Sequence, residues 1–108
     1  MKLKIYTLHD KAAAAFTTPF FMANDGLAIR AFQDNINSDK EDNIMLHPEQ
    51  FTLYQTGEFN DINGTITALG EPKIIAHGIE LVNEHKPKYS DADMQTLLDA
   101  INSLKKDN

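Results

Sequence analysis

The 108-residue chain contains no cysteine and no tryptophan. Without cysteine it can form no disulfide, and it offers no thiolate as a nucleophile or metal ligand. No stretch approaches the ~20 apolar residues of a membrane-spanning helix. The N-terminal sequence alternates where a signal peptide would have an apolar run. We therefore expect a soluble protein that stays in the compartment where it is made.

Positive charge is also scarce. Ten Lys and Arg residues stand against sixteen Asp and Glu, for a net charge of −6. Residues 1–38 hold four cations and three acids, whereas residues 39–108 hold six lysines and thirteen acids. Phosphate binding needs a local cluster of cations. A nucleic-acid surface is therefore expected only as a local patch in the N-terminal third.

Signals for catalysis are weak. The four histidines are far apart in the sequence, and none forms the HxxxH or HExxH pair of a helical zinc site: His9, His47, His77 and His85. No glycine-rich loop precedes a helix in the phosphate-binding form, and no serine lies in a nucleophile elbow. The sequence predicts no enzyme, no metal site and no cofactor.

The clearest local structure is a β-hairpin. Two β-prone runs, Phe51–Phe59 and Thr65–Leu69, flank the segment Asn60–Gly64. Asn-Gly supplies the positive φ angles that a tight reversal needs, and Asp61 can start the turn by bonding its own backbone. Gly70-Glu71-Pro72 breaks the chain again after the second run. Beyond it, Lys73–Ala76 and Ile79–Val82 are expected either as one strand with a glycine bulge or as two short pieces.

The first strand is predicted over Lys2–His9, because polar and apolar residues alternate there. Lys2, Lys4 and Tyr6 share one side of it, which we interpret as the outer face. That face is either a solvated surface with snorkelling lysines or a stacking tyrosine flanked by phosphate contacts.

Two further elements precede the hairpin. Phe20–Met22 is predicted as a short strand, with its aromatic rings mainly in the core; the alternative is an exposed Phe20 or Phe21 that stacks on a base. A helix is expected over about Gly26–Ile36, capped by Asn24 or Asp25, because its apolar residues recur on one face.

A second helix is predicted after Ser90, which begins a capping-box pattern. Its apolar residues form a narrow stripe at helical spacing: Met94, Leu97, Leu98, Ile101 and Leu104. The stripe packs either on the sheet or against a second copy of itself, as a homodimer interface.

The order of elements predicts an α+β fold in a single domain spanning residues 1–108. An antiparallel sheet of about four to five strands would carry the central helix and the C-terminal helix on one face.

Several motifs come in a recognisable order: Tyr6, Pro19-Phe20-Phe21, Gly26–Phe32, His47–Tyr54, Gly57–Gly64 and Glu71-Pro72. In this order they resemble the small non-structural protein of gokushoviruses, the single-stranded DNA phages of the Microviridae. The resemblance covers about residues 1–82 and leaves the role of the connector and helix in residues 83–108 open.

The resemblance implies a protein of the host bacterial cytoplasm that is not a component of the virion. The family is described as DNA-binding, and it is thought to help shift replication from duplex intermediates to single-stranded genomes for packaging. It supplies no active-site residues.

Two hypotheses follow for the function. In the first, the protein binds single-stranded DNA, with Tyr6 and Tyr54 forming an aromatic platform on one face of the sheet. The predicted DNA-binding residues are Lys2, Lys4, Tyr6, Arg30 and Tyr54. In the second, the acidic chain is a protein-interaction module that acts on a phage replication or scaffold protein, or on a host factor, without touching DNA.

Overall fold

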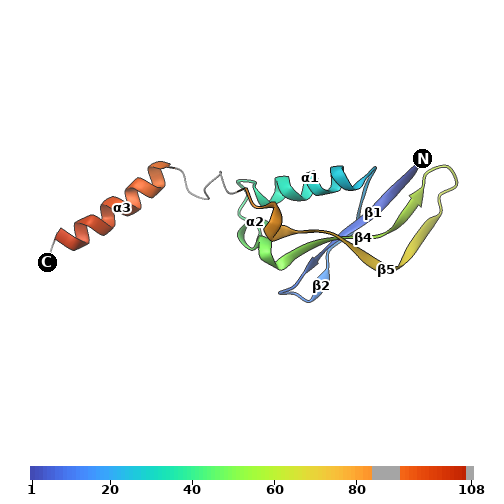
Figure 1. Cartoon of the computed structure of the whole chain (residues 1–108), viewed down its shortest axis with the longest axis horizontal. Helices are drawn as coiled ribbons and strands as arrows, with labels where there is room; N and C mark the ends of the chain where they lie inside the picture. The colour runs from blue at the N-terminus through green and yellow to red at the C-terminus, as the bar shows by residue number, and fades with distance from the viewer. Residues whose placement is uncertain (84–90, 107–108) are drawn as a thin grey trace.

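The computed structural model describes residues 1–83 and 91–106 (Figure 1). The elements along the chain are β1 Lys2–Asp10, β2 Ala15–Phe16, β3 Phe20–Met22, α1 Asp25–Ile36, α2 Asn43–Leu46, a 3₁₀ helix Pro48–Gln50, β4 Phe51–Asn60, β5 Ile66–His77, a 3₁₀ helix Gly78–Leu81 and α3 Asp91–Lys106. The predicted α+β class is confirmed.

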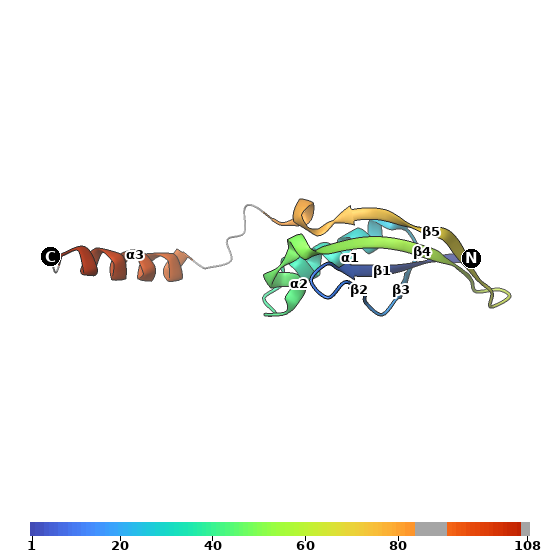
Figure 2. The same cartoon turned by 90° about the horizontal axis from the view of Figure 1, so that it is seen from below.

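All described strands belong to one antiparallel sheet. Its order is β2-β1-β4-β5, and the short β3 pairs with β1 beside β2. Helix α1 lies along one face of this curled sheet (Figures 1 and 2). In Figure 2, seen from below, β1 and β4 pass in front of α1.

The core lies between α1 and the sheet. Tyr6, Phe32 and Leu53 are its largest side chains with almost no exposure. Helix α1 begins as predicted, because the Asn24 side chain accepts a hydrogen bond from the Leu27 N–H at 2.9 Å. Its buried residues, including Ile36, follow the predicted apolar stripe.

The hairpin prediction is confirmed. The Asn60 N–H donates to the Thr65 carbonyl at 2.9 Å, and Gly64 has the positive φ of 75° that the turn requires. The side chains of Asn60 and Asn63 bond the turn backbone. Asp61, expected in that role, instead pairs with the N-terminal ammonium at 2.8 Å.

Strand β5 is longer than the sequence indicated. It continues through Gly70 and Pro72, where we expected a break. The extra residues of β5 form an irregularity in the strand pairing opposite Gln55–Gly57. The following run, Ile79–Val82, is not a strand. The 3₁₀ helix Gly78–Leu81 takes its place, and Gly78 lies so close to the Pro48 carbonyl that a Cβ would not fit there.

The C-terminal helix is present as α3, but the predicted packing on the sheet is wrong. Both views show α3 apart from the sheet (Figures 1 and 2). The covered face is already closed by α1, with Leu81 and Val82 packed against the same core. Within α3, Leu98 and Ile101 are about half exposed. The homodimer interface stays a prediction. The structure does not describe the side chains of three residues of its stripe, Met94, Leu97 and Leu104.

Candidate functional site: the open face of the sheet

Strand pairing assigns each paired side chain to one of two faces. On the face away from α1, residues stand opposite one another in four rows across β1, β4 and β5. These rows define the open face: Leu3, Phe59 and Ile66; Ile5, Gly57 and Ala68; Thr7, Tyr54 and Ile74; His9, Thr52 and His77. None of these paired positions holds Lys, Arg, Asp or Glu.

Aromatic rings gather at two places on the open face. Strand β2 pairs Phe16 with His9, and the two rings meet edge to face at 4.8 Å. Tyr54 completes this aromatic cluster, 5.4 Å from Phe16 and 6.3 Å from His9. Towards the hairpin, Phe21 of β3 contacts Phe59 at 5.7 Å. Phe16 and Phe21 are both about half exposed, which leaves ring surface free for a ligand.

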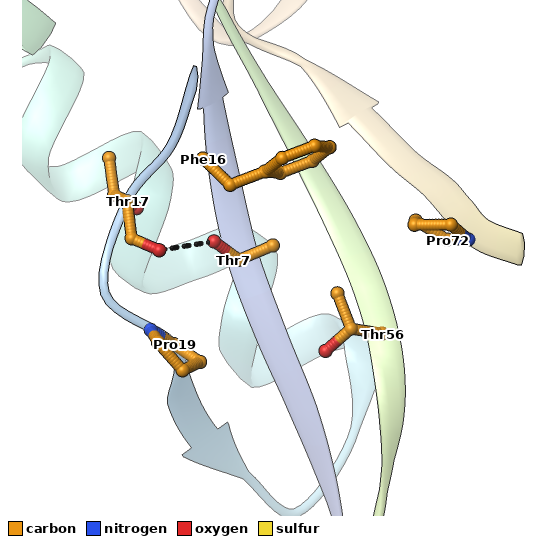
Figure 3. Close-up of a pocket in the computed structure, with 6 residues that line it drawn as sticks. All are labelled: Thr7, Phe16, Thr17, Pro19, Thr56 and Pro72. Atoms are coloured by element: carbon orange, nitrogen blue, oxygen red, sulfur yellow. Dashed lines mark hydrogen bonds between the residues drawn. The ribbon is translucent and has the colours of Figure 1, made fainter. Parts of the chain in front are cut away.

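A shallow pocket of about 230 Å³ adjoins the aromatic cluster (Figure 3). It is lined by Thr7, Phe16, Thr17, Pro19, Thr56 and Pro72. The Thr7 hydroxyl donates to the Thr17 carbonyl at 2.7 Å, and the Thr56 hydroxyl donates to the Ile5 carbonyl. Since these hydroxyls are occupied by the backbone, the pocket suits an apolar or stacking group.

The lysines of the strands lie on the covered face. Lys4 contacts the Asp25 carboxylate at the start of α1 at 3.1 Å, and the Tyr6 hydroxyl donates to the same oxygen at 2.5 Å. The hydrogen bond from Tyr6 lowers the pKa of Asp25, and Lys4 and Lys73 add to the effect. Burial and the bond to Asp25 raise the pKa of Tyr6. This cluster joins β1 to the N-terminus of α1.

The predicted tyrosine platform is therefore wrong. Tyr6 is fully buried and faces α1, whereas Tyr54 is on the open face beside Phe16. Alternation along β1 was assigned correctly, but the face with Lys4 and Tyr6 is the inner one, because Tyr6 and Leu8 pack in the core under α1 while the Lys4 ammonium reaches Asp25.

The remaining predicted DNA-binding residues are dispersed. The Lys2 ammonium is 3.9 Å from the Glu58 carboxylate, on the same face of the sheet as Lys4. Arg30 is exposed on α1. Only Tyr54 is on the open face. Sequence reasoning missed Phe16, which follows a run of four alanines; the bulky ring after four small residues was the available signal.

The described residues contain neither a metal-ligand cluster nor a membrane-spanning helix. No three His, Cys, Asp or Glu side chains lie close enough together there to hold a metal ion. No described helix is both long and apolar enough to cross a membrane.

Fold and site together define a small α+β protein with an open, uncharged and aromatic sheet face. The family model for the Phage ORF5 protein matches residues 3–81. The chain belongs to this family and is therefore a phage protein. No curated protein and no solved structure matches it.

Proposed function

We propose that this phage protein binds single-stranded DNA on the open face of its sheet. It would thereby act as an accessory protein in the replication or packaging of a single-stranded DNA genome, of the gokushovirus kind that its motifs resemble. It would work in the cytoplasm of the host bacterium and outside the virion. The proposal assigns it no reaction and no cofactor.

The observation that supports this function is the cluster of Phe16, Tyr54 and His9 on the sheet face opposite α1. Exposed rings on a β-sheet are the usual stacking surface for unpaired bases, and each stacked base contributes about 1–3 kcal/mol. Duplex DNA hides its base faces, so such a surface favours single strands. The rings of Phe21 and Phe59 at the other end of the face extend the surface along the strands.

The lack of charge on the open face predicts that DNA binding depends only weakly on salt. The paired positions of the open face hold no Lys or Arg, so few phosphates would be neutralised on binding. For single strands, the logarithm of affinity falls by about 0.7 for each neutralised phosphate per decade of salt. We therefore expect the affinity to fall less steeply with salt than it would if about two phosphates were neutralised.

The test is fluorescence anisotropy of labelled single-stranded and duplex oligonucleotides, titrated with the protein over a range of salt. Single strands should bind more tightly than duplexes. Phe16→Ala and Tyr54→Ala should each weaken binding by about tenfold. Tyr54→Phe keeps the ring and should bind like the wild type. Lys4→Gln, on the covered face, is the control for the alternative lysine surface.

Two results would contradict the proposal. Absence of single-strand binding even at low salt would remove the DNA function. Steep salt dependence together with loss of binding in Lys4→Gln would move the site to the covered face and its lysines.

A second candidate is a protein-interaction module, favoured by the same uncharged face and by the net charge of −6. Phe16, Phe21 and Ile74 are each about half exposed there, which suits an apolar protein surface. The phage replication initiator and scaffold protein are the partners to test, with purified components. This candidate would be favoured if the protein binds either partner but not DNA, and if Phe16→Ala abolishes the binding to that partner.

A further inference from the structure

His9, Thr52 and His77 form one row across three strands of the open face. His9 of β1 stands opposite Thr52 of β4, which in turn stands opposite His77 of β5. The Thr52 hydroxyl and His77 Nδ1 are 3.2 Å apart, within hydrogen-bonding distance. Adjacent strands are about 4.8 Å apart, so the two histidines stand about 10 Å from each other. We call these three residues the histidine row.

The histidine row adjoins the aromatic cluster, since the His9 ring contacts both Phe16 and Tyr54. Its imidazoles are also the groups on the paired open-face positions that can gain positive charge. An imidazole donates an N–H in its neutral form and carries a full charge when protonated, and a threonine hydroxyl is a further donor.

We propose that the histidine row is the phosphate-binding element of the open face. His9, Thr52 and His77 contact the backbone of a single strand whose bases stack on Phe16 and Tyr54. This inference rests on the proposed DNA-binding function and assigns the polar half of that site. The lysines of β1 cannot take this role, because Lys4 is on the other face and is engaged by Asp25.

The inference predicts a direction of pH dependence. A protonated imidazole would add positive charge beside the bound phosphates, so we expect acidification to tighten binding. Tyr54 faces the row from β4. Lys11 follows β1 and Glu80 follows β5, both exposed. Asp10 is on the opposite face, where its carboxylate accepts the Ala12 N–H at 3.1 Å.

The experiment measures the affinity for a labelled oligothymidine at constant ionic strength between about pH 7.5 and about pH 5.5, where ordinary carboxylates stay ionised. The wild type should bind about tenfold more tightly at the lower pH, and His9→Gln and His77→Gln should each remove about threefold of that gain. The double variant should lose nearly all of it while still binding at neutral pH through its rings.

His47→Gln is the matched control. His47 is an exposed histidine outside the open face, 3.8 Å from Glu49. It should leave the pH response unchanged, and circular dichroism should show that all variants keep the fold. If the double variant binds DNA with the full pH response, the histidine row is not the phosphate site, although the DNA function stands. If no variant and no pH gives binding, both proposals fall.

Discussion

The two faces of the sheet are built from the same strands, yet they carry opposite chemistry. The covered face packs Tyr6 and Leu53 under α1 and holds the charged contact between Lys4 and Asp25. The open face displays Phe16 and Tyr54 without a charged residue among its paired positions. The lysines of the strands and the exposed rings therefore lie on opposite faces of the sheet. A ligand on the open face must be recognised mainly by stacking and hydrogen bonds.

The strongest test of this difference uses two neighbouring residues. Leu53→Ala should lower the free energy of unfolding by about 2–5 kcal/mol, because it leaves a cavity in the core. Tyr54→Ala should cost less than about 1.5 kcal/mol, since it removes mainly the ring contacts with His9 and Phe16. Urea denaturation measures both, and equal losses would show that the open face is covered in solution.

Alternation in the sequence was sufficient to predict β1 as a strand but not which of its faces is the inner one. Along β1, Leu3 and Ile5 make one side apolar, while Tyr6 and Leu8 make the other side apolar too. Period two sorts residues into two sets, and only the packing of α1 decides which set is buried. The sequence signal was strong for the hairpin because Asn-Gly has a specific conformational requirement.

The candidate site was less predictable, because it depends on contacts between distant segments. Phe16 reaches Tyr54 only because a two-residue strand pairs with the end of β1. Such a strand is too short to leave a period in the sequence. The register shift opposite Ile5 and Tyr6 is another long-range feature, since the extra residue is on β4.

The second prediction concerns the polar contact that closes the covered face. Tyr6→Phe should cost about 1–2 kcal/mol, because it removes a hydrogen bond to a carboxylate. Asp25→Asn should also destabilise the protein at neutral pH. The pKa of Asp25 is lowered by folding, so its ionised form stabilises the fold above its ordinary pKa of about 4, and that contribution is lost as the pH falls further.

Unfolding measured against pH checks this sign. The difference between wild type and Asp25→Asn should be full at neutral pH and should shrink below about pH 4. The open-face variant Tyr54→Phe is the control and should show a constant difference. If this difference in the free energy of unfolding grew in acid, the ionised form of Asp25 would not be stabilised by Tyr6 and Lys4 in the folded protein.

The third prediction concerns the turn that holds β4 and β5 in register. A slip of one residue between β4 and β5 would exchange inner and outer side chains on one strand. Gly64→Ala should cost about 1 kcal/mol, because its φ of 75° is unfavourable for residues with a Cβ. Nothing lies within 4 Å of the added methyl group, so register should be kept. Thermal unfolding measures the loss, and cross-strand nuclear Overhauser effects report the register.

The smallest expected effect is that of Lys2, and it separates the sequence-based site from the open face. Its ammonium is 3.9 Å from Glu58 and both side chains are exposed, so Lys2→Gln should change stability by less than about 0.5 kcal/mol. Lys2 was predicted to bind DNA, yet its side chain belongs to the side of Lys4. If bases stack on the open face, Lys2→Gln should leave single-strand affinity within about twofold of the wild type, whereas Phe16→Ala weakens it about tenfold. The reverse ranking, measured by anisotropy in one buffer, would show that DNA follows the lysines around the edge of the sheet, and the uncharged face would then be the surface for a protein partner.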